Sequence, residues 1–112
     1  MIIVGDIGNT ETKICLVNSK NKIVKRVNID TKKINLTILK KAISGLNIKK
    51  KLIKKCLICS VVPKSFNEIK SFFNKVYKIK CYELKKLKLN QLINVYFAVL
   101  YQNHLIKLNV MN

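Results

Sequence analysis

The segment at residues 6–13 has the residue types and spacing best suited to chemistry. It reads Asp-Ile-Gly-Asn-Thr-Glu-Thr-Lys. A carboxylate at the end of a strand can hold a magnesium ion directly or through water, and the turn after it offers backbone amides and a hydroxyl to phosphate oxygens. A lysine on the returning strand can neutralise charge on a terminal phosphate. We therefore expect a phosphate-gripping hairpin with these candidate ligands: Asp6, Gly8, Asn9, Thr10 and Lys13.

The same segment can also be interpreted as an ordinary hairpin, because Asp, Gly and Asn are common turn formers. It is not a Walker loop, since no GxxxxGK[ST] pattern occurs and the segment leads into a strand rather than a helix. Taken alone, the motif leaves a phosphate site and a plain turn both open.

The residues around this segment predict the elements that position it. An apolar run at residues 2–7 predicts a central strand, and residues 12–17 and 23–29 predict two more strands joined by turn residues. Strands two and three are expected to form an antiparallel hairpin. The first third of the chain is therefore predicted to be a three-stranded meander.

The rest of the chain alternates between helical and extended patterns. Apolar residues at helical spacing predict an amphipathic helix on which Leu36 shares the buried face, and a second helix that Ser65 and Glu68 open as a capping box. Two further strands and a last helix complete the pattern. The strands are expected at residues 57–62 and 77–82, and the last helix at residues 89–105.

The resulting order is β-β-β-α-β-α-β-α, an α/β fold with one mixed sheet flanked by helices. This succession resembles a single lobe of the ribonuclease-H-like fold used by the actin, sugar-kinase and heat-shock ATPase superfamily. A chain of 112 residues has room for one domain of ordinary size. We therefore expect one lobe.

The formal charge of +18 is compatible with nucleic-acid binding, because lysines release counterions from phosphate backbones. Only one of the 23 basic residues is arginine, however, and arginine is the residue that bidentate base and phosphate recognition favours. Lysine, asparagine and isoleucine, whose codons are rich in A and T, supply 51 residues. The charge is thus interpreted as a solvated lysine coat, with only non-specific affinity for nucleic acid.

A cytoplasmic location without membrane insertion is expected. The longest unbroken apolar run, residues 95–101, is far shorter than the roughly 20 residues of a spanning helix, and the first residues lack the basic leader of a signal peptide. Cys56 and Cys59 form a single CxxC without the partners of a zinc site, and on a strand they would point to opposite faces. We expect reduced, mostly buried cysteines.

A second motif makes a family resemblance specific. Asp6-Ile7-Gly8-Asn9-Thr10 with Lys13 resembles the opening phosphate motif of type III pantothenate kinases, and residues 59–63, Cys-Ser-Val-Val-Pro, resemble the same family's second-strand motif at about the expected separation. The resemblance covers residues 1–84, which would form the N-terminal phosphate-binding lobe. Residues 85–112 are expected to be a divergent C-terminal helix and tail.

The resemblance implies an enzyme that transfers the γ-phosphoryl group of ATP to pantothenate, the first step of coenzyme A synthesis. It implies a homodimer that uses Mg²⁺ and a monovalent cation, K⁺ or NH₄⁺. Carried over by position, Asp6 would bind the metal, Gly8, Asn9 and Thr10 would cradle the ATP phosphates, and Lys13 would add positive charge. Such positioning and electrostatic stabilisation are the main requirements of phosphoryl transfer.

The sequence also departs from the family pattern. The family next has a Gly-Ala-Asp-Arg segment that supplies the general base and the arginine for the pantothenate carboxylate. An alignment on Asn94 places Asn90 and Gln91 there, and neither can take the proton or supply the charge. No carboxylate follows Glu83, and the family's second lobe is not found.

The expectation is thus a truncated or degenerate type III pantothenate kinase, inactive alone. A gene that ends early, or half of a split enzyme completed by a second polypeptide, would explain it. Two alternatives stay open: a non-catalytic regulatory or partner-binding module of the same fold, and a lysine-rich polyanion binder.

Overall fold

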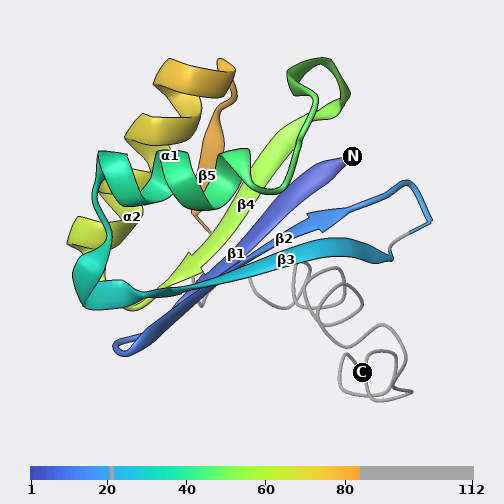
Figure 1. Ribbon diagram of the computed structural model, residues 1–112. Helices are drawn as coiled ribbons and strands as arrows, with labels where there is room; N and C mark the ends of the chain where they lie inside the picture. Colours follow the sequence, from blue (N-terminus) through green and yellow to red (C-terminus); the bar gives the residue numbers. More distant parts are fainter. Residues whose placement is uncertain (21, 84–112) are drawn as a thin grey trace, which may run out of the picture.

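A five-stranded mixed sheet forms the centre of the computed structural model, which describes residues 1–20 and 22–83 (Figure 1). The strands lie in the order β3-β2-β1-β4-β5, so the first strand is in the middle of the sheet. Their bounds are β1 (Ile2–Ile7), β2 (Glu11–Val17), β3 (Ile23–Asp30), β4 (Lys55–Ser60) and β5 (Cys81–Glu83).

Two helices cover one face of this sheet (Figure 1). They are α1 (Leu36–Ser44) and α2 (Pro63–Phe72), and α2 continues into a π-helical turn, η3 (Phe73–Tyr77). Short 3₁₀ turns, η1 (Thr31–Lys33) and η2 (Lys50–Leu52), precede α1 and β4. The N-cap of α1 is Asn35, whose Oδ1 accepts a hydrogen bond from the Ile38 amide at 2.8 Å.

Strand pairing confirms the predicted α/β fold class and the three-stranded meander. β1 pairs antiparallel with β2, and β2 with β3, whereas β1–β4 and β4–β5 are parallel. The parallel pairs are joined through α1 and α2, as parallel strands require a crossover. The architecture is that of a single ribonuclease-H-like lobe. The predicted last helix at residues 89–105 lies outside the described residues.

Alternation along the strands separates two apolar clusters. Ile3, Ile7 and Ile14 are almost fully buried beneath the helices with Leu39 and Phe72. On the opposite face a smaller cluster gathers the following side chains: Val4, Cys15 and Val17, with Ile2, Ile23, Leu57 and Cys59 packed against them. The core between helices and sheet is thus the larger of the two.

Four local predictions differ from the structure. The strand expected at residues 57–62 is β4, which begins and ends two residues earlier. Helix α2 begins at Pro63, and its N-cap Val62 makes no side-chain capping bond, so the predicted Ser65 capping box is wrong. Proline suits the first helical position because its φ is already helical and its missing N–H is not needed there. Leu36, expected on the buried face, is 50% exposed. β5 is shorter than predicted because η3 continues to Tyr77 and is followed by its C-cap Lys78, whose φ is 58°.

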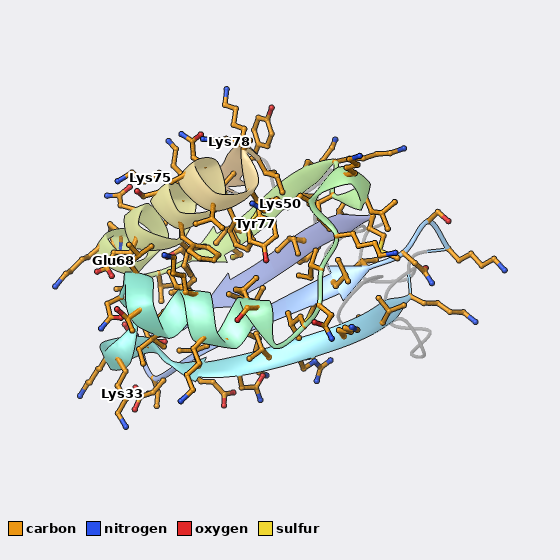
Figure 2. All side chains as sticks on the ribbon, turned by 45° about the horizontal axis from the view of Figure 1, so that its top comes forward. Lys33, Lys50, Glu68, Lys75, Tyr77 and Lys78 are labelled. Carbon is orange, nitrogen blue, oxygen red and sulfur yellow. The ribbon has the colours of Figure 1, made fainter. Side chains whose placement is uncertain are left out.

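Lysine side chains project outward around the described lobe, among them Lys33, Lys75 and Lys78 (Figure 2). Lys50 instead lies over the ring of Tyr77, with its Nζ 5.6 Å from the ring centroid (Figure 2). Among residues 1–20 and 22–83, no helix has the length and hydropathy to cross a membrane.

The cysteines behave as predicted. All four are free thiols, and Cys59 alone is partly exposed. Cys56 belongs to the cluster beneath the helices and Cys59 to the opposite cluster, so the two point to opposite faces of β4. Burial raises the pKa of the Cys56 thiol well above its ordinary value, with a further rise from neighbouring Cys81.

Candidate functional site

The first predicted motif forms the tight connection between β1 and β2. Ile7 pairs with Thr12, and the Gly8 amide donates to the Glu11 carbonyl at 3.0 Å. A Cβ at Gly8 would lie only 3.1 Å from that same carbonyl oxygen, which explains why glycine stands there. Asn9 and Thr10 are exposed at the tip, where backbone amides and the threonine hydroxyl are accessible to a ligand.

Asp6 is the residue before Ile7, at which β1 ends. It pairs with Lys13 on β2 and with Cys59 on β4, so all three side chains share the face of the sheet opposite the helices. Asp6 and Lys13 are both partly exposed. The pKa of the Cys59 thiol is raised mainly by burial and further by the negative charges of Asp6 and Glu83. A carboxylate therefore lies beside a cation on the surface of the central strands.

The second predicted motif lies directly against the first. The Val61 amide, just after β4, donates to the Ile7 carbonyl at 3.1 Å. Ser60 Oγ accepts from the Val62 amide and lies 3.0 Å from the Val62 carbonyl, a local turn that leads into α2. The pairing of β4 with β1 thus joins two segments that are more than fifty residues apart in sequence.

A hollow of about 270 Å³ lies where these motifs meet the helices. Its walls come from the hairpin tip, η1, the β4–α2 connection and the first turns of α2. They consist of Asn9, Thr31, Lys32, Ile34, Val62, Lys64, Ser65 and Glu68. Of the predicted site residues only Asn9 lines it. Asp6 and Lys13 lie on the other face of the sheet, so the hairpin presents ligands to two sides.

Thr31 is a site residue that the sequence did not reveal. Its amide donates to the Thr10 carbonyl at 3.0 Å, and its Oγ1 donates to the Gly8 carbonyl at 2.8 Å. Thr12 Oγ1 is 2.8 Å from Thr31 Oγ1, and both threonines are buried. The sequence offers one signal for this contact, which is Thr12. It is a polar residue on the same face of β2 as the apolar residues Ile14 and Leu16, so its hydroxyl needs a partner.

A magnesium site would have a single protein carboxylate here. Among the described residues, no group of three or more His, Cys, Asp or Glu side chains could hold a metal ion. Mg²⁺ retains several waters and commonly takes one or two carboxylates together with substrate phosphates. The partly exposed Asp6, beside a turn with accessible amides, fits that mode of binding and does not fit an all-protein cage.

Comparison with known proteins decides the family. The profile of the type III pantothenate kinase family matches residues 2–101 of the chain. The chain belongs to the type III pantothenate kinase family. This confirms the family predicted from the two motifs, and the match extends over most of the chain.

A curated relative supports the same assignment. The chain is 72% identical over 95 residues to the type III pantothenate kinase of Pelagibacter ubique (strain HTCC1062). The aligned part is 85% of this chain and 38% of that type III pantothenate kinase, so the chain spans well under half of the relative's length. Asn90 and Gln91, the predicted replacements for the family's base and arginine, lie outside the described residues.

Proposed function

We propose that this chain provides the first phosphate-binding lobe of a pantothenate kinase that transfers the γ-phosphoryl group of ATP to pantothenate in coenzyme A synthesis. The observation that carries the proposal is the bond from the Val61 amide to the Ile7 carbonyl, because it holds the two family motifs side by side. Family membership and the 72% identity to a type III pantothenate kinase support it.

In this proposal each residue of the first motif has a separate task. Asp6 would hold the Mg²⁺, and Lys13 on the neighbouring strand would offset negative charge on the terminal phosphate. Asn9 and Thr10, which are exposed, supply backbone amides and a hydroxyl to the phosphate oxygens, while Gly8, whose own amide donates to the Glu11 carbonyl, lets the backbone turn tightly enough to present them. The bound cation would neutralise phosphate charge as the γ-phosphoryl group leaves. Preorganised donors of this kind reduce the barrier because they need no rearrangement during the reaction.

Further parts of the proposal concern the assembly. We propose a monovalent cation, K⁺ or NH₄⁺, as cofactor, and a homodimer or a second polypeptide that completes the site. The chain alone is proposed to bind nucleotide without turning it over. A cytoplasmic location is proposed as well, which the four free thiols favour because disulfides are rare in that compartment.

The test compares two carboxylates of the same hairpin. Asp6→Asn removes the proposed metal ligand, and Glu11→Gln removes an equal charge from an exposed residue of β2 that has no proposed role. Calorimetric titration with MgATP should show affinity reduced about tenfold or more for Asp6→Asn and nearly unchanged for Glu11→Gln, as expected when one charge-assisted contact is lost.

Two outcomes would contradict the proposal. Equal binding by wild type and Asp6→Asn would remove Asp6 from the site. Affinity that depends steeply on salt but not on Mg²⁺ would instead indicate a polyanion binder that uses its lysine coat. Turnover is checked separately by incubating the chain with MgATP, K⁺ and pantothenate, where robust phosphopantothenate formation would contradict inactivity of the lone chain.

A further inference from the structure

We infer that Thr31 is the positioning residue of the phosphate hairpin, an inference that rests on the proposed function. Thr31 lies at the start of η1, immediately after β3, and is only 5% exposed. Its backbone and side chain bond the carbonyls on both sides of Asn9, those of Gly8 and Thr10. Two segments that are separated by about twenty residues are thereby held together at the tip.

The number of hydroxyl protons defines which oxygen donates in each hydrogen bond between Thr12, Thr31 and Gly8. A threonine hydroxyl carries one proton, and that of Thr31 goes to the Gly8 carbonyl at 2.8 Å. The contact of 2.8 Å between the two hydroxyl oxygens therefore requires Thr12 to donate to Thr31. The result is a short chain of bonds from Thr12 through Thr31 to Gly8, in which each hydroxyl proton has an acceptor.

The network has a consequence for a bound phosphate. Carbonyl oxygens repel phosphate oxygens, so an anion site works only if its carbonyls are turned away and its amides remain available. Thr31 holds the Gly8 and Thr10 carbonyls in bonds within the protein. It also lines the hollow beside Asn9, so it supports the tip from the helix side without belonging to the set of proposed ligands.

Substitutions at the two threonines can separate positioning from stability. Thr31→Val keeps the shape and the amide bond to Thr10, but it removes the donor to Gly8 and leaves the Thr12 hydroxyl without its acceptor. Thr31→Ser keeps the hydroxyl. Thr12→Val is the matched control, because it removes one buried hydroxyl and leaves the bond from Thr31 to Gly8 intact. The double variant Thr12→Val/Thr31→Val removes both hydroxyls, so no buried hydroxyl is left unpaired.

Two measurements are made on the full chain. The exchange rate of the Gly8 amide hydrogen reports the hairpin without ligand, and calorimetric titration with MgATP reports the phosphate site. For Thr31→Val we expect amide exchange about tenfold faster and MgATP affinity about tenfold lower, since a buried bond to the hairpin is lost. Thr31→Ser and Thr12→Val should remain close to wild type in both.

The double variant provides the sharpest outcome. Because replacing both partners by apolar groups of the same shape removes the unpaired hydroxyl, it should unfold at a higher temperature than Thr31→Val. Its Gly8 amide should still exchange fast and its MgATP affinity should stay low. Wild-type affinity in the double variant, or equal effects of Thr31→Val and Thr12→Val, would overturn the inference. Failure of wild type to bind MgATP would contradict the proposed function, and Gly8 exchange would still decide the role of Thr31.

Discussion

Gly8→Ala and Gly45→Ala form a pair of substitutions that tests how closely the phosphate hairpin is packed. Both changes reduce the entropy of the unfolded state, which by itself contributes about 0.4–1 kcal/mol of stability. At Gly45 the backbone is helical, with φ of −63°, and a Cβ would lie 3.5 Å from the Ala42 carbonyl oxygen, an ordinary contact. We therefore expect Gly45→Ala to raise the free energy of unfolding by about 0.5 kcal/mol.

At Gly8 the same methyl group meets the backbone. Its Cβ would lie 3.1 Å from the Glu11 carbonyl oxygen, which already accepts a hydrogen bond from the Gly8 amide at 3.0 Å. If the backbone moves to relieve this close contact, the hydrogen bond between Gly8 and Glu11 lengthens. Overpacking of this kind costs about 1–3 kcal/mol, which outweighs the entropic gain. We expect Gly8→Ala to lower the free energy of unfolding by about 1 kcal/mol, a difference of about 1.5 kcal/mol from Gly45→Ala.

Urea unfolding followed by far-ultraviolet circular dichroism measures both values, and equal slopes against urea would show that the unfolded states are comparable. MgATP affinity should fall for Gly8→Ala only, because the displaced tip carries the proposed phosphate ligands. If Gly8→Ala were as stabilising as Gly45→Ala, the close approach of Glu11 would not constrain the hairpin, and our explanation of the glycine would be wrong.

Further predictions concern the core, the helix cap and the pH dependence of stability. Ile43→Ala, at a fully buried site, should cost about 2–5 kcal/mol in urea unfolding, whereas Leu36→Ala, at a half-exposed site, should cost less than about 1 kcal/mol. Asn35→Ala should lower the free energy of unfolding by about 1 kcal/mol, whereas Asn35→Asp should leave it nearly unchanged, because aspartate keeps the acceptor for the Ile38 amide. Similar losses from both substitutions would contradict the role of Asn35 as the N-cap of α1. Burial raises the pKa of the Cys56 thiol in the folded state above its ordinary 9.0, so the thiol ionises first in the unfolded state as pH rises. The contribution of the neutral thiol to the free energy of unfolding is therefore fully present below pH 9. Above pH 9 it falls by about 1.4 kcal/mol per pH unit. Unfolding measured from pH 8.5 to 10 should therefore show a shallower decline in Cys56→Ala than in wild type, and parallel curves would refute the assignment.

The sequence was most informative where local chemistry decides the structure. Strands β1, β2 and β3 were predicted within one residue at each end, because apolar runs there stop at turn residues such as Gly8 and Asn18. The start of α2 was predicted wrongly. Ser65 and Glu68 have the spacing of a capping box, but the helix already begins at Pro63. The helical spacing of apolar residues likewise predicted the buried face of α1. It did not predict that Leu36, in the first turn of that helix, is half exposed.

The site divides in the same way. Asp6 and its neighbours form a contiguous motif, so their chemistry can be interpreted from spacing alone. That Asp6 lies on the face of the sheet opposite the helices follows from strand register, and the role of Thr31 follows from a contact between the end of β3 and the hairpin. A hydroxyl that bonds a carbonyl twenty residues away leaves no periodic signal in the sequence.

The position of β1 in the middle of the sheet has a consequence for synthesis on the ribosome. Its antiparallel neighbour β2 emerges immediately, but its parallel neighbour β4 ends only at Ser60. Until then one side of β1 has unpaired amides and carbonyls, the kind of open edge that pairs with other chains. Closing the loop between β1 and β4 is also entropically slow compared with forming a hairpin. The nascent meander therefore has an open strand edge that can pair with other chains until β4 has been synthesised.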